Sequence, residues 1–416
     1  MSSDAYHAGL DDAGDATGQH SRQESLRQQP RTRIVAGCMT GTSIDGIDVA
    51  VMRITGTGLA MRAQLMASAS MELDGPFGQL VIPLRDFAEQ RPVIAGHIAD
   101  VSRRFSLLHA AAVQAAARKA GVPINLVVLH GQTVWHRPPV SWQLCSPAVV
   151  AHELGVPVIS DLRAADLAAG GQGAPITPLA DWVLFGQDAA SADQPDDCTA
   201  IVNLGGFVNY TILRSGRGPE HITAGDVCVC NHVLDKIARL TLGEPFDRGG
   251  AAALRGKPNL KAKEELAALC NAQASDGRSL GTGDEMERWL GNWKDPLTGP
   301  DLCATACAAI GGTIGRTLVH ATCSYNLARI LVFGGGANNQ GMLSEITRAI
   351  KARPGTTVQS GDSVGIGLHE REAACMAVLG ALSQDGVPIT LPQVTKLPPG
   401  IAAPVAGSWC GINSRP

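Results

Sequence analysis

The sequence has 416 residues, of which 45% are hydrophobic and 17% are charged, and its formal net charge is −4. A chain of this length can bury the cores of two domains. It lacks the basic character of a nucleic-acid-binding protein and the uninterrupted run of about 18 apolar residues that a membrane helix needs. We therefore expect a soluble globular protein with no nucleic-acid partner and no membrane partner.

The N-terminal residues 1–30 are polar and contain no apolar core of the kind found in signal peptides. We predict a disordered extension and, by default, a cytoplasmic protein. The 11 cysteines show no disulfide framework, and only Cys228 and Cys230 form a close pair. Because no second pair follows at zinc-ligand spacing, we expect reduced, mostly buried thiols and no metal site among them.

The first predicted elements form a β-hairpin within Gly37–Met52. Alternating apolar residues, typical of strands, flank a turn that holds glycines, hydroxyls and acids. The backbone N–H groups and hydroxyls of this turn could hold phosphate oxygens, and Asp45 and Asp48 could hold a cation that offsets phosphate charge. Considered by itself, the turn is better explained as an ordinary Gly/Asp hairpin turn than as a phosphate site.

A second motif, His130-Gly131-Gln132-Thr133, follows a short apolar strand. In open α/β sheets ligands bind just past the carboxyl ends of strands, so this placement favours a binding role. The alternative is that His130 is a structural histidine. The elements predicted in this part of the chain are strands near 61–69 and at 126–129, 142–144 and 156–159, and helices over 93–120 and 147–154.

Residues 161–175 (DLRAADLAAGGQGAP) are the densest cluster of polar residues and glycines in the chain. The glycines allow the backbone to fold tightly beside a ligand. Asp166, at the rim of such a loop, is well placed to act as a general base. The alternative is that Asp166 caps a helix or pairs with Arg163.

The polar, Asp-rich residues 187–198 predict a linker between a first domain, residues 31–198, and a second, residues 199–416. The second begins with a strand, a Gly-Gly turn and a strand, which repeats the opening hairpin and indicates an internal duplication around a central cleft. The remaining predicted elements are strands at 199–202, 210–213 and 330–333, helices near 233–240, 260–270, 301–320 and 370–382, the last of which could pack back on the first domain, and an irregular tail from 388.

In combination, the motifs make the chain resemble the anhydro-N-acetylmuramic acid kinases of the sugar-kinase, Hsp70 and actin superfamily. The motifs are GCMTGTSIDGID, HGQTVWHRP, DLRAADLAAGGQGAP, NLGGFVN, FDRGGAAA, FGGGANN and EREAA, and they run from about residue 33 to about residue 382. The resemblance implies a two-domain α/β fold of the actin and sugar-kinase type, with duplicated mixed β-sheets on either side of a cleft for ATP and an amino sugar.

The implied reaction is ATP-dependent phosphorylation of 1,6-anhydro-N-acetylmuramic acid at O6, with hydrolytic opening of the anhydro ring. Its products are N-acetylmuramate 6-phosphate, an intermediate of cell-wall recycling, and ADP. Asp166 matches the family's base, and Mg²⁺ would offset charge on the transferring phosphoryl group. A homodimer is also implied.

The resemblance further assigns binding roles to individual residues. Those implied in ATP binding are Gly41, Thr42, Ser43, Ile44, Asp45, Gly46, Ile47, Asp48, Asn203, Gly205, Gly206, Gly334, Gly335, Gly336 and Asn338. Those implied in substrate binding are His130, Gln132, Thr133, Arg163, Asp226 and Asn231.

Two segments depart from the family's pattern. Residues 226–231 (DVCVCN) replace a loop of sequence Asp-Thr-Gly-Pro-Gly-Asn, and we expect their β-branched and thiol side chains to lie where backbone would otherwise approach the ligand. Residues 143–147 (QLCSP) replace a Gln-Ile-Gly-Asp pattern and remove an acid. Two alternatives therefore stay open: a kinase of another anhydro sugar such as levoglucosan, and a non-catalytic nucleotide- or sugar-binding protein. Asp166 favours an enzyme, because a binding protein needs no base.

Overall fold

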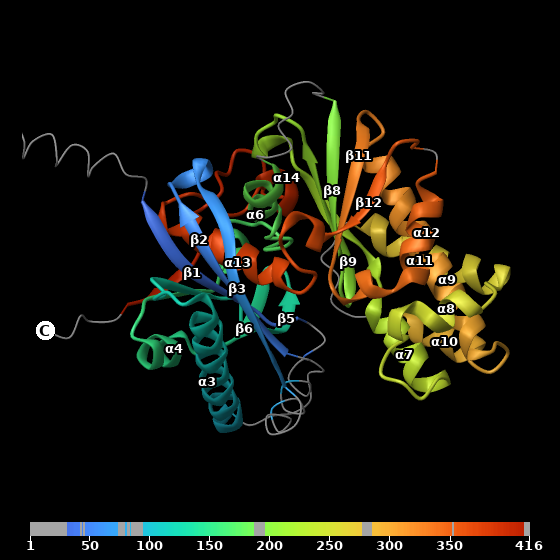
Figure 1. Ribbon diagram of the computed structural model, residues 1–416, viewed down its shortest axis with the longest axis horizontal. Coiled ribbons are helices and arrows are strands. Elements are labelled where there is room, and N and C mark those ends of the chain that lie inside the picture. Colours follow the sequence, from blue (N-terminus) through green and yellow to red (C-terminus); the bar gives the residue numbers. More distant parts are fainter. Residues whose placement is uncertain are drawn as a thin grey trace, which may run out of the picture.

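A computed structural model of the protein describes residues 31–41, 44, 46–73, 80, 84, 95–186, 196–276, 285–351 and 353–411. The predicted N-terminal extension and most of the predicted linker lie outside these residues, as do Thr42, Ser43 and Asp45 of the opening turn. The described chain forms two lobes, each built around one β-sheet, and the lobes lie side by side in Figure 1.

The first lobe contains a six-stranded sheet with the strand order β13-β7-β4-β1-β2-β3. Three strands, β1 to β3, form an antiparallel meander, and β4 and β7 add in parallel on the other side of β1. The predicted opening hairpin is therefore confirmed as β1 and β2. The strands are β1 (Thr32–Met39), β2 (Gly46–Thr55), β3 (Arg62–Glu72), β4 (Leu126–Leu129), β7 (Val158–Ser160) and β13 (Ser408–Cys410).

The second lobe repeats this arrangement in a five-stranded sheet with the order β10-β9-β8-β11-β12. An antiparallel meander, β8 to β10, is again extended by two parallel strands on the other side of its first strand. The shared order and directions confirm the predicted internal duplication. The strands are β8 (Asp197–Leu204), β9 (Phe207–Arg214), β10 (Thr223–Val229), β11 (Asn326–Phe333) and β12 (Thr357–Ser360).

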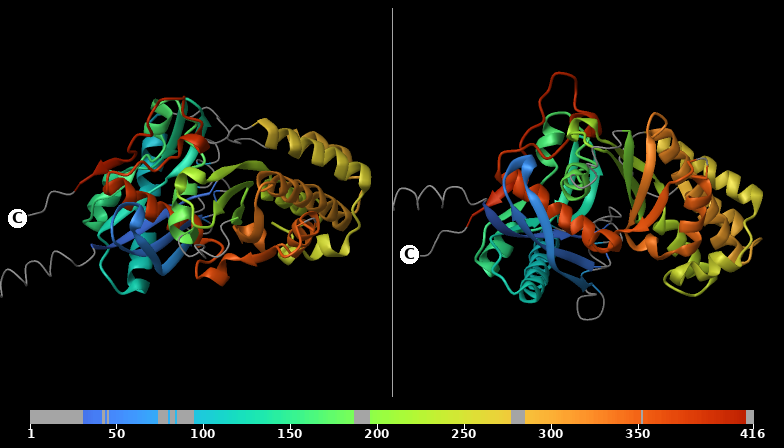
Figure 2. Two further views of the ribbon diagram at one scale, coloured as in Figure 1. Left: turned by 90° about the horizontal axis from the view of Figure 1, so that it is seen from above. Right: turned by 45° about the horizontal axis from the view of Figure 1, so that its top comes forward.

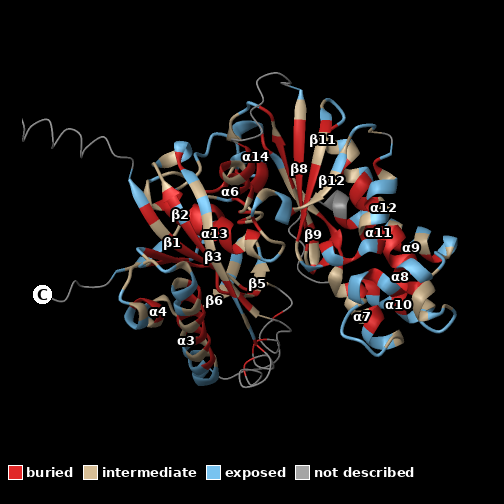
Figure 3. Ribbon diagram, in the orientation of Figure 1, coloured by how far each residue is buried: buried red, intermediate tan, exposed pale blue. Residues whose placement is uncertain are grey.

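Helices cover both faces of the first sheet because its central strands bury apolar side chains on both faces. Ala36 and Val49 belong to the core on the α3 side, whereas Val35 and Ala50 belong to the core on the α13 side. Figure 3 shows these central strands and α13 as largely buried. The helices that cover the first sheet are α3 (Ala95–Ala120), α4 (Pro147–Leu154) and α13 (Glu370–Gln384).

Helix α13 comes from the C-terminal part of the chain but packs on the first sheet, as Figure 2 shows in red against the blue strands. A Cβ atom at Gly37 of β1 would lie 2.0 Å from the carbonyl oxygen of Ala373. Only glycine leaves room for the helix backbone at that distance, so Gly37 allows α13 to lie directly on β1.

In the second lobe the helices gather on one side of the sheet around α11. This helix is long and apolar enough to cross a membrane by length and composition alone, but 78% of its most apolar window is buried in the fold. Its residues Cys303 and Cys307 are buried on the same face, as the sequence predicted, so α11 is a core helix. The helices are α7 (Asn231–Thr241), α8 (Ala251–Arg255), α9 (Leu260–Asp276), α10 (Glu285–Trp293), α11 (Gly299–Ala321) and α12 (Gln340–Ala349).

Three segments differ from the sequence-based predictions. Residues 226–229 lie in strand β10 and not in a loop. The tail beyond residue 388, predicted as irregular, contains α14 and a strand, β13, which pairs with β7 at the edge of the first sheet. The HGQT motif leads into a hairpin of which only residues 142–144 were predicted. The additional short elements are β5 (Gln132–Arg137), β6 (Val140–Leu144), α5 (Ala164–Ala168), α6 (Pro178–Asp181) and α14 (Pro392–Thr395).

Candidate active site

The carboxylate of Asp166 is fully buried and is held by one hydrogen bond to each oxygen. Its Oδ2 atom accepts a 2.8 Å hydrogen bond from the backbone N–H of Gly173, and its Oδ1 atom accepts one of 2.8 Å from the hydroxyl of Thr395. A Cβ atom at Gly171 would lie 2.2 Å from Oδ2. The glycine-rich loop therefore folds around the carboxylate of Asp166 itself.

Arg163, at the start of α5, connects this loop to the HGQT motif. Its guanidinium donates to Nε2 of His130 at 2.9 Å through Nη2, and to the carbonyl oxygen of Gly173 at 2.7 Å through Nη1. Gly173 thus binds Asp166 through its N–H and Arg163 through its C=O. The hydrogen bonds of Asp166 go to the loop and to the tail, and its partners in the described chain do not include Arg163.

His130 is a neutral acceptor in this arrangement. Burial, and secondly the charge of Arg163, lower the pKa of His130 to about 3. Its Nδ1 atom lies 2.8 Å from the carbonyl oxygen of Gly131, so Nδ1 carries the proton and Nε2 is free to accept from Arg163. Burial lowers the pKa of Arg163 to about 10, while the charges of Asp226 and Glu372 act in the opposite direction. Arg163 therefore remains charged at neutral pH.

The two acids near Arg163 come from different parts of the fold. Asp226 lies in β10 of the second lobe, and Glu372 lies in the first turn of α13. Burial raises the pKa of Glu372, and the charge of Asp48 in β2 adds to this effect, whereas Arg371 and Arg163 oppose it. Residues of both lobes thus come within electrostatic range of one another.

The second phosphate motif, the adenosine motif and Asn231 lie together in the second lobe. The side chain of Asn231 donates a 2.9 Å hydrogen bond to the carbonyl oxygen of Leu204, and its backbone N–H donates to Gly205 at 3.1 Å. A Cβ atom at Gly336 would lie 2.8 Å from Oδ1 of Asn231. Three segments that are far apart in the sequence therefore form one surface of closely packed backbone, with Gly335 exposed on it.

Other predicted nucleotide-binding residues are less directly placed. The side chains of Ile44 and Ile47 are buried in the core of the first lobe, so only their backbone can face a ligand. Asn338 is exposed at the end of a short 3-10 turn, whereas its neighbour Asn339 is buried and caps α12. Thr42, Ser43 and Asp45 lie outside the described residues.

The DVCVCN segment requires a correction. The side chains of residues 227–230 are fully buried in the core of the second lobe, where they pack with α9 and α11. A β-bulge between Asp226 and Val229 accompanies this arrangement. The expectation that the β-branched and thiol side chains lie against the ligand was wrong, because strand β10 turns them into the core. Only the two ends, Asp226 and Asn231, remain partly exposed.

Sequence reasoning missed four residues in and around the site: Thr395, Glu372, His136 and Ser141. Glu372 belongs to the EREAA motif, where two acids and an arginine open an otherwise apolar helix, and this contrast was an available signal. Thr395 had no such signal, because its contact with Asp166 joins positions 229 residues apart. His136 and Ser141 lie in the β5–β6 hairpin, where His136 is within electrostatic range of Arg163.

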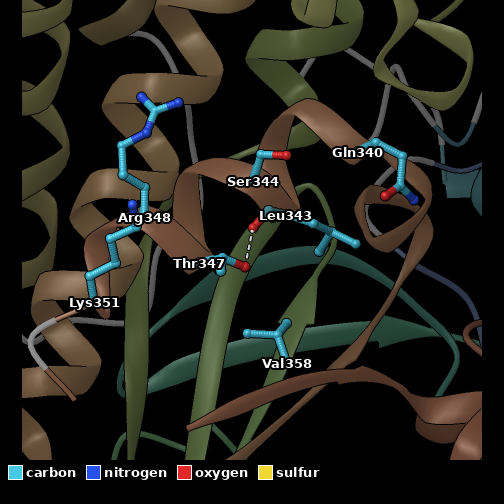
Figure 4. Close-up of a pocket in the computed structure, with 7 residues that line it drawn as sticks. All are labelled: Gln340, Leu343, Ser344, Thr347, Arg348, Lys351 and Val358. Atoms are coloured by element: carbon cyan, nitrogen blue, oxygen red, sulfur yellow. Dashed lines mark hydrogen bonds between the residues drawn. The ribbon is translucent and has the colours of Figure 1, made fainter. Parts of the chain in front are cut away.

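A surface pocket of about 450 Å³ lies elsewhere, on the outer face of the second lobe (Figure 4). It is lined by residues of α12 and β12, among them Leu343, Arg348 and Val358. None of its lining residues belongs to the predicted site. The hydrogen bonds and electrostatics around Asp166 therefore define the candidate site better than this pocket does.

Comparisons with known proteins agree with the sequence motifs. The family model for anhydro-N-acetylmuramic acid kinase matches residues 33–399. The anhydro-N-acetylmuramic acid kinase of Salinibacter ruber is 31% identical over 388 residues, which cover 87% of this chain and 93% of that protein. That of Methylobacterium nodulans is 32% identical over 397 residues, which cover 91% and 99%.

A solved ROK family glucokinase from Streptomyces griseus, in complex with glucose and AMPPNP, is 13% identical with a TM-score of 0.36, and the match covers 83% of this chain and 97% of that one. This likeness is too loose to support a function. The two mixed sheets described above agree with the two-domain α/β fold that the motifs led us to expect. With most of its length matched by the family model and by such relatives, the chain belongs to the anhydro-N-acetylmuramic acid kinase family.

Proposed function

We propose that the protein phosphorylates 1,6-anhydro-N-acetylmuramic acid at O6 at the expense of ATP and opens the anhydro ring with water. The observation that carries this proposal is the arrangement around Asp166, whose carboxylate is oriented by Gly173 and Thr395. The names of the relatives support the choice of sugar.

The chemistry explains why a fixed carboxylate is needed. The anhydro sugar has no O6 hydroxyl proton to remove, so a water molecule attacks the anomeric carbon and the bond from that carbon to O6 breaks. O6 bonds to the γ-phosphorus as the bond to the β-phosphate oxygen breaks, and Asp166 takes the proton of the water. Each Asp166 oxygen accepts one hydrogen bond within the protein and keeps a lone pair for this water.

Arg163 and His130 serve in this proposal to position the loop and to bind the sugar. Neutral His130 accepts a hydrogen bond from the guanidinium of Arg163 and does not neutralise its charge. The guanidinium also donates to the carbonyl oxygen of Gly173, the residue whose N–H orients Asp166. Gln132 is buried, and its Oε1 atom has no hydrogen-bond partner among the described residues. A sugar hydroxyl would satisfy this acceptor.

Asp48 and Glu372 suit Mg²⁺, which the family implies. Carboxylate oxygens are the ligands that Mg²⁺ prefers, and it is usually held by one or two of them together with phosphate oxygens. The ion would supply positive charge to the transferring phosphoryl group. It would also offset the negative charge of Asp48, which raises the pKa of Glu372.

The nucleotide would lie between the β1–β2 turn and the glycine turns of the second lobe. We propose the domain boundary between residues 31–198 and 199–416, so that each domain contributes one phosphate-binding turn. Helix α13 then belongs to the second domain by sequence but packs on the sheet of the first. It would connect the nucleotide-binding side to Asp48 and Arg163.

The decisive experiment measures ADP release with 1,6-anhydro-N-acetylmuramic acid and, separately, with levoglucosan. The wild-type protein should release ADP with the former, and Asp166→Asn should lower kcat at least about 100-fold, because general-base catalysis contributes about that much. Asp295→Asn is the matched control, since the side chain of Asp295 is 78% exposed and pairs with Lys294, which is not a residue of the site.

Two other outcomes would change the proposal. ADP release with levoglucosan alone would identify a kinase of another anhydro sugar. If the protein binds ATP but neither sugar gives ADP, the kinase proposal is wrong, and the chain is a nucleotide- or sugar-binding member of the family.

A further inference from the structure

Helix α14, a short helix of the C-terminal tail, lies between the two lobes (Figure 1). It packs against β10 of the second sheet. Its last residue, Thr395, donates a hydrogen bond to the proposed base, Asp166, which belongs to α5 of the first lobe. A single short element therefore contacts the second lobe and the carboxylate of Asp166 at the same time.

Apolar side chains anchor α14 on the second lobe. The side chain of Val394 is buried in a hydrophobic cluster on the face of the second sheet that points away from α11, together with Ile201 of β8. Leu391 packs against this cluster and also against the core of the first lobe. The side-chain amide of Gln393 adds a 3.0 Å hydrogen bond to the carbonyl oxygen of Pro219, just before β10. These contacts fix the place of α14 on the second sheet.

Thr395 holds both Asp166 and the glycine-rich loop. Its side chain is fully buried, and its hydroxyl lies 2.8 Å from Oδ1 of Asp166 and 3.3 Å from the carbonyl oxygen of Leu391. The hydroxyl has one proton, and the shorter contact with the charged carboxylate is the stronger one, so Thr395 donates to Asp166. The carbonyl oxygen of Thr395 accepts a 2.7 Å hydrogen bond from the backbone N–H of Gln172 in the loop.

Asp166 itself is rooted in the first lobe. Its neighbour Ala165 packs, with Leu162, in the core that includes residues of α13. Of the two hydrogen bonds to the carboxylate, the one from Gly173 comes from the loop of the same lobe, and the one from Thr395 comes from α14. A catalytic group must be held to within about 0.5 Å of its productive position, so the loss of either bond matters for the rate.

We infer that Thr395 is a positioning residue for the reaction, and that α14 is the element through which the second lobe holds the base. This inference rests on the proposed function, in which Asp166 takes the proton of the attacking water. Thr395 acts through Asp166 and not on the substrate. Because α14 is anchored on one lobe and Asp166 on the other, the relative position of the two lobes sets the position of the carboxylate.

The first test compares kcat and KM of wild-type protein, Thr395→Val and Thr395→Ser in the ADP-release assay with 1,6-anhydro-N-acetylmuramic acid. Valine has nearly the shape of threonine but cannot donate a hydrogen bond. Thr395→Val should therefore lower kcat about 10- to 100-fold and leave the KM values for ATP and sugar unchanged within about threefold. Thr395→Ser keeps the hydroxyl and should retain kcat within about threefold.

Val394→Ala tests the anchor on the second lobe. The smaller side chain lets α14 shift on the second sheet, so kcat should fall about fivefold although Thr395 and Asp166 are both intact. Ile201→Val is the matched control, because Ile201 is buried in the same cluster but belongs to β8. It should leave kcat unchanged within about twofold.

Three results would overturn the inference. Wild-type kcat in Thr395→Val would mean that Asp166 needs no support from α14. A rise in KM with unchanged kcat would assign Thr395 to substrate binding. Equal losses in Val394→Ala and Ile201→Val would mean that the cluster acts only through the general stability of the second lobe.

Amide hydrogen exchange tests the same support without any substrate. The N–H groups of Gln172 and Gly173 are bonded to Thr395 and Asp166, so Thr395→Val and Val394→Ala should each speed their exchange about tenfold, whereas Ile201→Val should not. If the wild-type protein releases no ADP with any sugar, the proposed function fails, and these rates decide whether α14 holds Asp166. Unchanged exchange in both variants would refute that support.

Discussion

At the scale of single residues, the orientation of the Asp166 carboxylate depends on the absence of a side chain at Gly171. Gly171 lies so close to the carboxylate that a Cβ atom there would come within 2.2 Å of Oδ2. Gly173 and Thr395 then each hold one of the two oxygens by a hydrogen bond. The glycine-rich sequence is thus required by the position of the acid and not only by flexibility of the loop.

Gly171→Ala should therefore lower kcat strongly while changing sugar binding little. The added methyl group must displace the carboxylate, and a displacement of about 1 Å of a catalytic group costs on the order of 100-fold in rate. Steady-state kinetics with anhydro-muramic acid would measure kcat and KM separately. Gly96→Ala in α3, where a Cβ atom meets nothing within 4 Å, is the control. Wild-type kcat in Gly171→Ala would show that Asp166 needs no such precision.

At the scale of elements, the first turn of α13 joins three parts of the molecule. Glu370 accepts a 3.1 Å hydrogen bond from Ser68 of β3, Arg371 pairs with Asp181 of α6, and Glu372 lies near Asp48. Successive side chains of a helix point about 100° apart, so three neighbouring residues can contact three different parts of the molecule. This turn lies at the junction of the two lobes.

The Arg371–Asp181 pair is the strongest of these links. Both side chains are almost completely buried, and Nε of Arg371 donates to Oδ1 of Asp181 at 2.9 Å. Thr211 of the second sheet also donates to Asp181, at 2.8 Å. Burial lowers the pKa of Arg371, but the charge and hydrogen bond of Asp181 act together with nearby Cys375 and Glu372 to outweigh this effect, and the net shift is upward. The pair therefore remains ionised in the interior.

Asp181→Asn should destabilise the fold by about 3–5 kcal/mol, because it leaves the Arg371 charge buried without its counter-charge. Urea denaturation would measure the change in free energy of unfolding. The exposed pair Lys294–Asp295 is the comparison, and Asp295→Asn should change stability by less than about 1 kcal/mol. Equal effects of the two substitutions would contradict the importance of the buried pair.

At the scale of the whole molecule, buried histidines make stability depend on pH. Burial lowers the pKa of His109 from 6.5 to about 4, opposed by its hydrogen bond to Phe105. Because the folded-state pKa lies below the unfolded one, the unfolded chain binds more protons between pH 6.5 and 4. The contribution of His109 is therefore complete above about pH 6.5 and is lost as the pH falls.

At pH values below 6.5, the protonation of this histidine in the unfolded chain should decrease the free energy of unfolding by about 1.4 kcal/mol per pH unit. His109→Leu should remove that part of the slope, whereas His152→Gln on the surface should not. Urea denaturation at pH 7, 6 and 5 would measure it. An unchanged slope in His109→Leu would mean that His109 is protonated without cost in the folded state.

Much of the fold could be predicted because its elements are locally encoded. The strand at 126–129 and the helix at 147–154 were predicted with the bounds that the structure has, since short apolar runs there end at clear polar or proline signals. The duplication was visible because both halves begin with a strand, a glycine turn and a strand. Strand β5 was missed because its sequence, QTVWHR, does not alternate, and the bulge in it explains why.

The sequence by itself determined the two-sheet α/β architecture, the family and the identity of Asp166 as the candidate base. Only the tertiary structure decided what surrounds that base and where the DVCVCN side chains point. Thr395 reaches Asp166 from a tail that has no periodic pattern, and Asp226 approaches Arg163 from the other lobe. The physical reason is the same in each case: local patterns specify which elements form, whereas contacts between distant residues depend on how those elements pack.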